Sequence, residues 1–214
     1  MIVGKGQIVV EGHGELEAAH NLVTRLSHDL GVFIPWTAPR RSPNIHLQRG
    51  VEKVAARARC EPDTTAMLIL RDEDDRCPAE TAPMIAAWLR ALSLPFPTAI
   101  VLLHREYEAL FLPCIDIMAG RELNAYGSRR PGILAGTTFE GDPQGIRGVK
   151  EWLSKRFPRG TSYKPTLDQL PLTRMLDFNR LRDSALPCFG SLERAIRFLG
   201  DHLGTTGHAY PGPR

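Results

Sequence analysis

Apolar runs of strand length alternate with helix-length segments whose apolar residues recur every three to four positions, and this alternation limits the fold most. The run Ala66–Leu70 is continuous, as expected for a central parallel strand covered on both faces. Three more strands are expected, at Gln7–Val10, Val32–Trp36 and Thr98–Leu103. Three helices are expected between them, over Glu15–Leu30, Leu47–Ala58 and Ala82–Leu92. The pattern therefore predicts an α/β fold, with a parallel sheet flanked by helices.

The pattern changes after His104, where helical segments replace the alternation. A chain of 214 residues can bury one sizeable core, so we expect one α/β core over residues 1–120. A mainly helical C-terminal extension over 121–203 is expected to pack on it, followed by a flexible tail over 204–214. Within the second half, helices are expected over 106–118, 146–157, 167–176 and 192–203, and a loop over 127–141.

Composition excludes several classes of protein. Apolar residues make up 43% and charged residues 24%, which is typical of a folded globular chain. No apolar run approaches the ~20 residues of a membrane span, and the N-terminal segment turns acidic before a signal peptide could form, so we expect a cytoplasmic protein. Widely spaced cysteines without a CxxC pair predict neither a zinc site nor a disulfide framework; they are Cys60, Cys77, Cys114 and Cys188.

Acidic residues follow three of the expected strands at the point where each strand ends. Glu11 follows the first strand, Asp72 and Asp74 follow the central run, and Glu106 and Glu108 follow the last strand. The carboxyl ends of parallel strands share one edge of a sheet, where functional groups collect. Carboxylates placed together repel one another unless a cation binds, and oxygen ligands favour Mg²⁺, Mn²⁺ or Ca²⁺. These residues therefore predict a divalent metal site.

Each acidic cluster also has an ordinary structural explanation. Glu11 stands beside glycine, as in many turns, and residues 72–75 would suit a solvated loop. Glu106 and Glu108 would favour the start of a helix through its dipole. Only the convergence of the clusters at one edge favours the metal site over these explanations.

The order of these residues resembles a known pattern. The segments VVEGHGE (9–15) and LILRDEDD (68–75) are similar to the Toprim pattern of a glutamate after the first strand and an Asp-x-Asp after a later one. More narrowly, the chain resembles the DUF4276 family of small Toprim-like proteins. Further matches are REYEALFL (105–112), YKPT (163–166) with Asp168, MLD (175–177) and Phe189, which together span most of the chain. The third acid of the fullest Asp-x-Asp-x-Asp form falls at Arg76, which puts a second metal in doubt.

The resemblance implies a Toprim/Rossmann-like fold and phosphodiester chemistry that depends on Mg²⁺ or Mn²⁺. Toprim domains serve topoisomerases, primases, recombination proteins and OLD-type nucleases. The residues above predict neither a topoisomerase's tyrosine domain nor a primase's zinc domain, so the resemblance implies a nuclease acting on DNA or RNA. It further implies an ABC- or AAA-type ATPase partner in prokaryotic antiviral or plasmid defence. A non-catalytic, nucleic-acid-binding or regulatory partner of an ATPase is the alternative, and a homo-oligomer is left open.

The resemblance also implies roles for individual residues. Asp72 and Asp74 would grip the metal, with Glu11 as a further ligand or general acid/base, so that Asp72→Asn or Asp74→Asn would abolish cleavage. Glu106 and Glu108 would complete the metal site. The matched lysine of the YKPT segment, Lys164, would place positive charge on the phosphate, although a solvated lysine is the ordinary explanation.

Basic residues are concentrated away from the acidic clusters. The net charge of +3 is a weak signal, but Arg40-Arg41, Arg129-Arg130 and the segment 147–164 are locally basic. We expect the last of these, including Lys150, to guide a phosphate backbone or to be a solubilising face. Two glycine patterns carry no nucleotide site: Gly12-x-Gly14 lacks the third glycine of the dinucleotide fingerprint, and GKG (4–6) lacks the spacing of a phosphate-binding loop.

Overall fold

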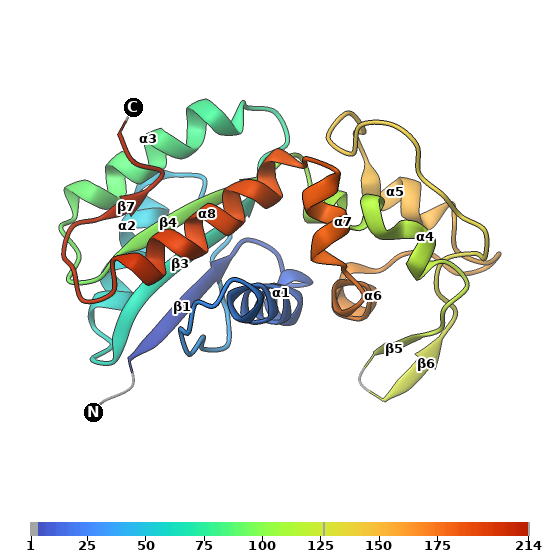
Figure 1. The fold of residues 1–214 in the computed structure, drawn as a ribbon, viewed down its shortest axis with the longest axis horizontal. Helices are drawn as coiled ribbons and strands as arrows, with labels where there is room; N and C mark the ends of the chain where they lie inside the picture. The colour runs from blue at the N-terminus through green and yellow to red at the C-terminus, as the bar shows by residue number, and fades with distance from the viewer. Residues whose placement is uncertain (1–3, 126, 214) are drawn as a thin grey trace.

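The computed structural model describes residues 4–125 and 127–213 (Figure 1). A five-stranded parallel sheet has the order β2-β1-β3-β4-β7. Its strands are β1 (Lys5–Val10), β2 (Arg40–Arg41), β3 (Thr64–Asp72), β4 (Thr98–Leu103) and β7 (Ala209–Tyr210). The central position of β3 fits its continuous buried apolar run. The predicted α/β fold with a parallel sheet flanked by helices is confirmed.

Helices cover both faces of this sheet, as Figure 1 shows with α1 and α8 in front and α2 behind. Successive side chains of a strand point to opposite faces. Leu68 and Leu70 of β3 therefore join the core beneath α1 and α8, whereas Met67 and Ile69 join the core beneath α2 and α3. The four helices are α1 (Glu15–Asp29), α2 (Gln48–Arg59), α3 (Pro78–Ala91) and α8 (Pro187–Asp201).

The chain between β4 and α8 forms the right half of Figure 1. It contacts the core where α6 packs on α1, and it brings α5 and α6 close to the segment that leaves β4. Its elements are the 3-10 segment η1 (Tyr107–Cys114), α4 (Ile115–Met118), β5 (Leu123–Ala125), β6 (Ser128–Arg130), α5 (Val149–Ser154), α6 (Pro165–Arg174) and α7 (Phe178–Asp183). Over the described ranges, no helix combines the length and the apolar character needed to cross a membrane.

Two segments differ from the sequence prediction because of proline. The expected strand Val32–Trp36 makes only an isolated bridge between Trp36 and Gly6, and the edge strand forms later, at β2. Pro35 has no N–H for a ladder, although its carbonyl accepts a hydrogen bond from Gly6 N at 2.9 Å. The expected helix 106–118 is mostly 3-10, with Pro113 inside it.

Two further segments gain strands that were not predicted. The expected loop 127–141 contains β6, which pairs with β5. The expected frayed tail contains β7, which pairs with β4 where Thr98 is level with Ala209. Arg90 Nη1 donates to the carbonyl oxygens of Ala209 at 3.1 Å and Pro211 at 2.8 Å. This contact joins residues far apart in sequence, so no local pattern indicated it. All four cysteines are free thiols; Cys114 and Cys188 are buried and Cys60 and Cys77 are exposed.

Candidate functional site

The ends of neighbouring strands bring acidic residues to one edge of the sheet. Glu11 directly follows β1 and Asp72 ends β3; these strands are parallel neighbours, with Val9 level with Ile69. Because β4 is also parallel to β3, the segment that follows it starts at the same edge. The structure therefore places Glu11 and Asp72 at a common edge, as the sequence predicts.

The side chain of Asp72 is anchored to the segment that follows β4. Its Oδ1 accepts a hydrogen bond from Tyr107 N at 2.8 Å. On either side of it in the chain, Arg71 and Glu73 form a buried ion pair, and Arg71 Nε donates to Asp72 O at 3.1 Å. Glu73 is thereby turned into the protein and stabilises the loop, while the Asp72 carboxylate is left for the site.

A lysine ammonium lies among three of the carboxylates. Lys150 Nζ lies 3.2 Å from Glu106 Oε1, 3.5 Å from Glu108 Oε2 and 3.7 Å from Asp72 Oδ2. The backbone N–H of Lys150 also donates to Glu106 Oε2 at 3.2 Å. We call these four residues the Lys150 cluster. The sequence placed Lys150 on a basic outer surface, whereas the structure places its charge within the acidic site.

Glu108 is the most deeply buried member of the cluster, with a side-chain exposure of 0%. Its Oε1 accepts hydrogen bonds from Tyr163 Oη at 2.8 Å and from Gln169 Nε2 at 3.4 Å. Within the described part of the chain, Oε2 accepts no hydrogen bond and faces the Lys150 ammonium. Burial raises the pKa of Glu108 to about 7, against the opposing effect of Lys150. Glu108 is therefore poised to change protonation state near neutral pH.

One ammonium does not balance the negative charge around it. Burial, followed by repulsion from Glu15 and Glu108, raises the pKa of Asp72 well above its usual range. Burial opposes the charge on Lys150, but attraction to Glu108, Asp72 and Glu106 outweighs burial and raises its pKa. Two carboxylates ~4 Å apart repel by roughly 4 kcal/mol near a protein surface. The cluster therefore favours the binding of additional positive charge.

Glu15 adds a carboxylate that the sequence analysis treated only as the start of a helix. It is 8% exposed, and its Oε2 accepts a hydrogen bond from Glu11 N at 3.3 Å. Burial raises the pKa of Glu15, and its charge in turn raises the pKa of Asp72. Its position four residues after Glu11, at the start of α1, was the available signal.

Three predicted site residues lie outside the Lys150 cluster. Glu11 is partly exposed, with His46 Nδ1 at 3.5 Å from its Oε1. Asp74 is exposed, and its charge acts on Arg71 and His104. Lys164 has an exposed side chain and directly precedes α6, where its backbone N–H donates to the buried Asp168 Oδ2 at 2.7 Å. The structure thus brings Asp72, Glu106 and Glu108 together around Lys150, whereas Asp74 and Lys164 lie outside this cluster.

The chemistry of the donor set fits a hard divalent cation. Among residues 4–125 and 127–213, no three His, Cys, Asp or Glu side chains are already arranged as a metal site, and the carboxylates of the cluster surround Lys150. All of its candidate ligands are carboxylate oxygens, and the buried Glu108 Oε2 lacks a hydrogen bond. Asp72, Glu106 and Glu108 are the residues that would hold Mg²⁺ or Mn²⁺.

The fold and the site define a parallel α/β protein with a carboxylate cluster beyond the strand ends. A family model described as "Domain of unknown function (DUF4276)" matches residues 10–197, which is most of the chain. The protein belongs to this family, as the resemblance of its sequence predicts. No curated protein and no solved structure matches the chain.

Proposed function

We propose that this protein is a Mg²⁺- or Mn²⁺-dependent nuclease of the Toprim type. The observation that carries the proposal is the convergence of Asp72, Glu106 and Glu108 at the carboxyl ends of parallel strands, where substrates of open α/β sheets bind. Such a cluster is costly without compensating charge, so its presence favours a role in binding a cation. The proposal includes an ABC- or AAA-type ATPase partner, as the resemblance implies, and a cytoplasmic location, which the sequence predicts from the absence of a signal-peptide pattern.

The metal, Glu11 and Lys150 would have separate roles in phosphodiester hydrolysis. The bound metal would supply a Lewis acid for a phosphoryl oxygen and lower the pKa of bound water. Glu11, partly exposed beside His46, would serve as a further ligand or as the general acid/base. The Lys150 side chain is 36% exposed, so its ammonium is suited to stabilise the negative charge of the phosphate. The resemblance gave this role to Lys164.

Arg105 carries donors that have no hydrogen-bond partner in the described structure. They are its buried Nε and Nη1. It directly precedes Glu106 in the segment that follows β4. A phosphate would satisfy such donors with charge-assisted hydrogen bonds. This unsatisfied arginine supports a phosphate-containing substrate.

Cleavage assays test the proposal. The purified protein is incubated with labelled single-stranded DNA, duplex DNA and tRNA in Mg²⁺, Mn²⁺ or EDTA, with and without an ATPase encoded beside it. Cleavage is expected only with metal, and Asp72→Asn is expected to reduce it by roughly 100-fold or more. Asp74→Asn is the matched control, and because Asp74 lies outside the Lys150 cluster we expect a smaller loss than the sequence predicted.

The Lys150 ammonium also favours the non-catalytic alternative. Because it already compensates part of the negative charge, the cluster could serve only to hold α5 on the core. A nucleic-acid-binding or regulatory partner of an ATPase would then bind nucleic acid without cutting it. Binding without cleavage in every metal, unchanged by Asp72→Asn, would select this alternative.

A further inference from the structure

We infer that a groove along α2 binds the phosphate backbone of a single nucleic-acid strand and leads it to Glu11. The inference deepens the proposed function and rests on it for the class of substrate. The groove has a volume of about 780 Å³ and lies between α2, the end of β1 and the loop that follows β2. We call it the α2 groove; its cationic lining residues are Arg40, Arg41, Arg49, Lys53 and Arg57.

The charge of the α2 groove is largely uncompensated. The described residues that line it include no Asp or Glu. Arg40 forms an ion pair with Glu61, but its buried Nη1 has no hydrogen-bond partner in the described structure. Arg49, Lys53 and Arg57 are exposed and form no ion pair with any described residue. A groove of this composition attracts a polyanion.

The spacing of three cations suits a nucleic-acid strand. Arg49, Lys53 and Arg57 recur at every fourth position of α2, so they share one side of the helix, about 6 Å apart along its axis. The row spans about 12 Å, a length over which one strand of a B-form duplex carries about four phosphates. The other side of α2 is buried on the sheet through Val51 and Ala55. The helix therefore presents its cations outward as a row.

The α2 groove also offers apolar surface between its charges. Leu47 is 52% exposed and Val54 is partly buried, and both line the groove. A nucleic-acid strand alternates anionic phosphates with sugars and bases that have apolar faces. A concave groove with both kinds of surface fits such a strand better than it fits a flat anionic surface.

The loop after β2 connects the α2 groove to the acidic site. Ser42 N donates to Val10 O at 2.8 Å, and Arg41 Nε donates to Glu11 O at 3.1 Å. His46, in the same loop, lies 3.5 Å from the Glu11 carboxylate. A strand that leaves the groove at its Arg41 end therefore reaches Glu11 and, beyond it, the edge of the sheet that carries the Lys150 cluster.

The basic segment 147–164, which the sequence suggested as the backbone track, is less suited to this role. Arg147 is paired with Asp75 at 3.2 Å, and Arg156 lies over the ring of Trp152 at 3.5 Å. Lys150 is engaged by the carboxylates. These partners break the basic run into separate charges, whereas the five cationic residues of the α2 groove line one continuous groove.

Binding in EDTA tests the inference without cleavage. The probes are fluorescent oligo(dT) and oligo(U) of about 20 nucleotides, longer than the ~4–16 nucleotides of a typical single-strand site. Arg49→Glu with Lys53→Glu is expected to weaken binding by roughly tenfold or more and to reduce the slope of log affinity against log salt by about 1.4, at ~0.7 for each phosphate contact. Arg49→Gln with Lys53→Gln is a milder second variant.

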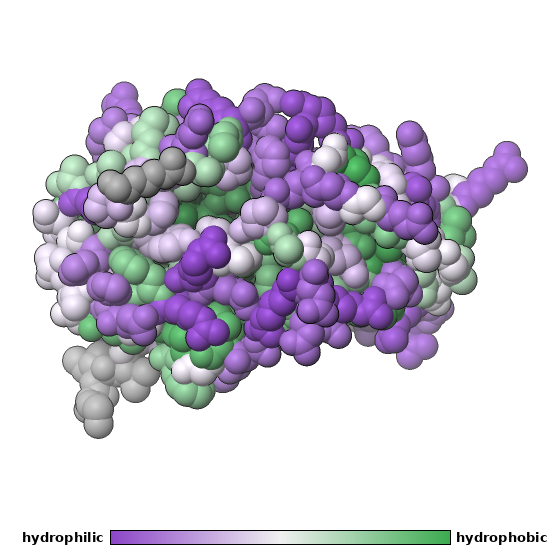
Figure 2. All heavy atoms as spheres, turned by 45° about the horizontal axis from the view of Figure 1, so that its top comes forward, coloured by the Kyte–Doolittle hydropathy of each residue, from purple (hydrophilic) through white to green (hydrophobic). Residues whose placement is uncertain are grey.

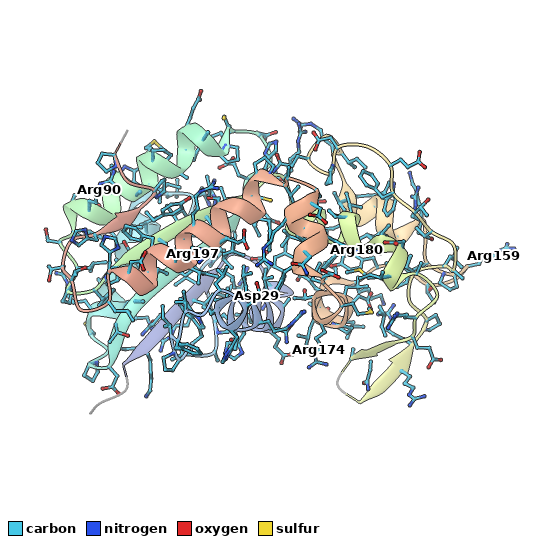
Figure 3. All side chains as sticks on the ribbon, viewed as in Figure 1. Asp29, Arg90, Arg159, Arg174, Arg180 and Arg197 are labelled. Carbon is cyan, nitrogen blue, oxygen red and sulfur yellow. The ribbon has the colours of Figure 1, made fainter. Side chains whose placement is uncertain are left out.

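Arg159→Glu with Arg197→Glu is the matched control. Both arginines are exposed and form no ion pair with any described residue; Figure 3 shows Arg159 at the far end of the molecule, and Arg197 on α8, which covers the opposite face of the sheet from α2. The control makes the same change in net charge, so it is expected to bind nearly as the parent does. Equal losses in both variants, an unaffected groove variant or a parent that binds neither probe would overturn the inference. Groove-dependent binding without metal-dependent cleavage would overturn the proposed nuclease and leave the inference standing.

Discussion

Lys150 Nζ lies 3.5 Å from Glu108 Oε2, and this contact joins the short helix α5 to the most deeply buried carboxylate of the site. The same ammonium contacts Asp72, the last residue of β3, and Glu106, which lies in the segment after β4. A single flexible side chain thus compensates charge that the strand ends bring together. The stability of the protein and its response to metal should both depend on this arrangement.

Removing the ammonium should destabilise the protein. Lys150→Met is expected to lower the free energy of unfolding by roughly 1–3 kcal/mol at about pH 8, less than for a fully buried pair because Lys150 is partly exposed. The loss should be smaller at about pH 5, where Glu108 is protonated. Urea unfolding in EDTA measures it. Lys155→Met, an exposed lysine next to the same helix, is the control, and equal effects of the two substitutions would contradict the account.

The raised pKa of Glu108 should make stability fall as pH rises. Its pKa of about 7 in the folded state exceeds the ordinary value of 4.5, so the folded state binds more protons between these pH values. The free energy of unfolding should therefore decrease across this interval. Glu108→Gln removes the titrating group, and its curve should be flatter. Asp72, whose pKa is also raised, leaves a residual slope in the variant. Identical slopes for parent and Glu108→Gln would show that Glu108 does not titrate there.

Divalent metal should stabilise the folded protein through the carboxylates. A saturating Mn²⁺ concentration of ~100 times the Kd would add about 2.7 kcal/mol to the free energy of unfolding. The rise in Tm should grow with pH, because metal displaces protons from Asp72 and Glu108. Thermal unfolding with and without Mn²⁺ checks this. Asp72→Asn should remove most of the shift and Asp74→Asn should keep it; the opposite order would place the metal outside the Lys150 cluster.

A second buried ion pair should matter for stability alone. Asp168 has 0% side-chain exposure; its Oδ1 lies 3.1 Å from Arg130 Nη1 and its Oδ2 accepts a hydrogen bond from Lys164 N at 2.7 Å. Asp168→Ala leaves the Arg130 charge without its partner and uncaps α6, so we expect a loss of about 3 kcal/mol. Metal affinity should be unchanged in the folded variant. A double-mutant cycle with Arg130→Ala measures the pair, and a coupling near zero would contradict its role.

Exposed arginines elsewhere should tolerate substitution. Figure 2 shows a face covered mostly by hydrophilic side chains, with hydrophobic ones in small groups, and Figure 3 shows Arg159 extending away from the protein. Arg159→Ala is therefore expected to change the free energy of unfolding by less than about 0.5 kcal/mol. Chemical denaturation measures it, and a larger loss would reveal a contact that the structure lacks.

The sequence predicted the parts of the fold that depend on local pattern. The buried run of β3, the strand β4 and the helical stripes of α1 and α2 follow from apolar periodicity, which a single segment carries by itself. Strand β7 depends instead on Arg90, more than a hundred residues earlier in the chain. Its two residues have no periodicity of their own, so it could not be predicted.

The sequence predicted those residues of the candidate site that directly follow the ends of strands. Asp72, Glu106 and Glu108 follow apolar strands, which fixed the edge of the sheet where they lie. Lys150 was missed because its helical spacing is that of an exposed face; only the packing of α5 against the segment after β4 turns it inward. Long-range packing, and not local pattern, decides which of the charged residues meet.

We expect Asp72, Glu106 and Glu108 to bind a divalent metal. Anomalous X-ray diffraction from crystals grown with Mn²⁺ tests it most directly, because the anomalous signal locates the ion without reference to activity. A peak is expected at ligand distance from the carboxylate oxygens of Asp72 and Glu108, with Lys150 Nζ displaced from at least one of the carboxylates that it contacts. Well-ordered Lys150 contacts to all three carboxylates, with no anomalous peak beside them, would contradict metal binding at this cluster.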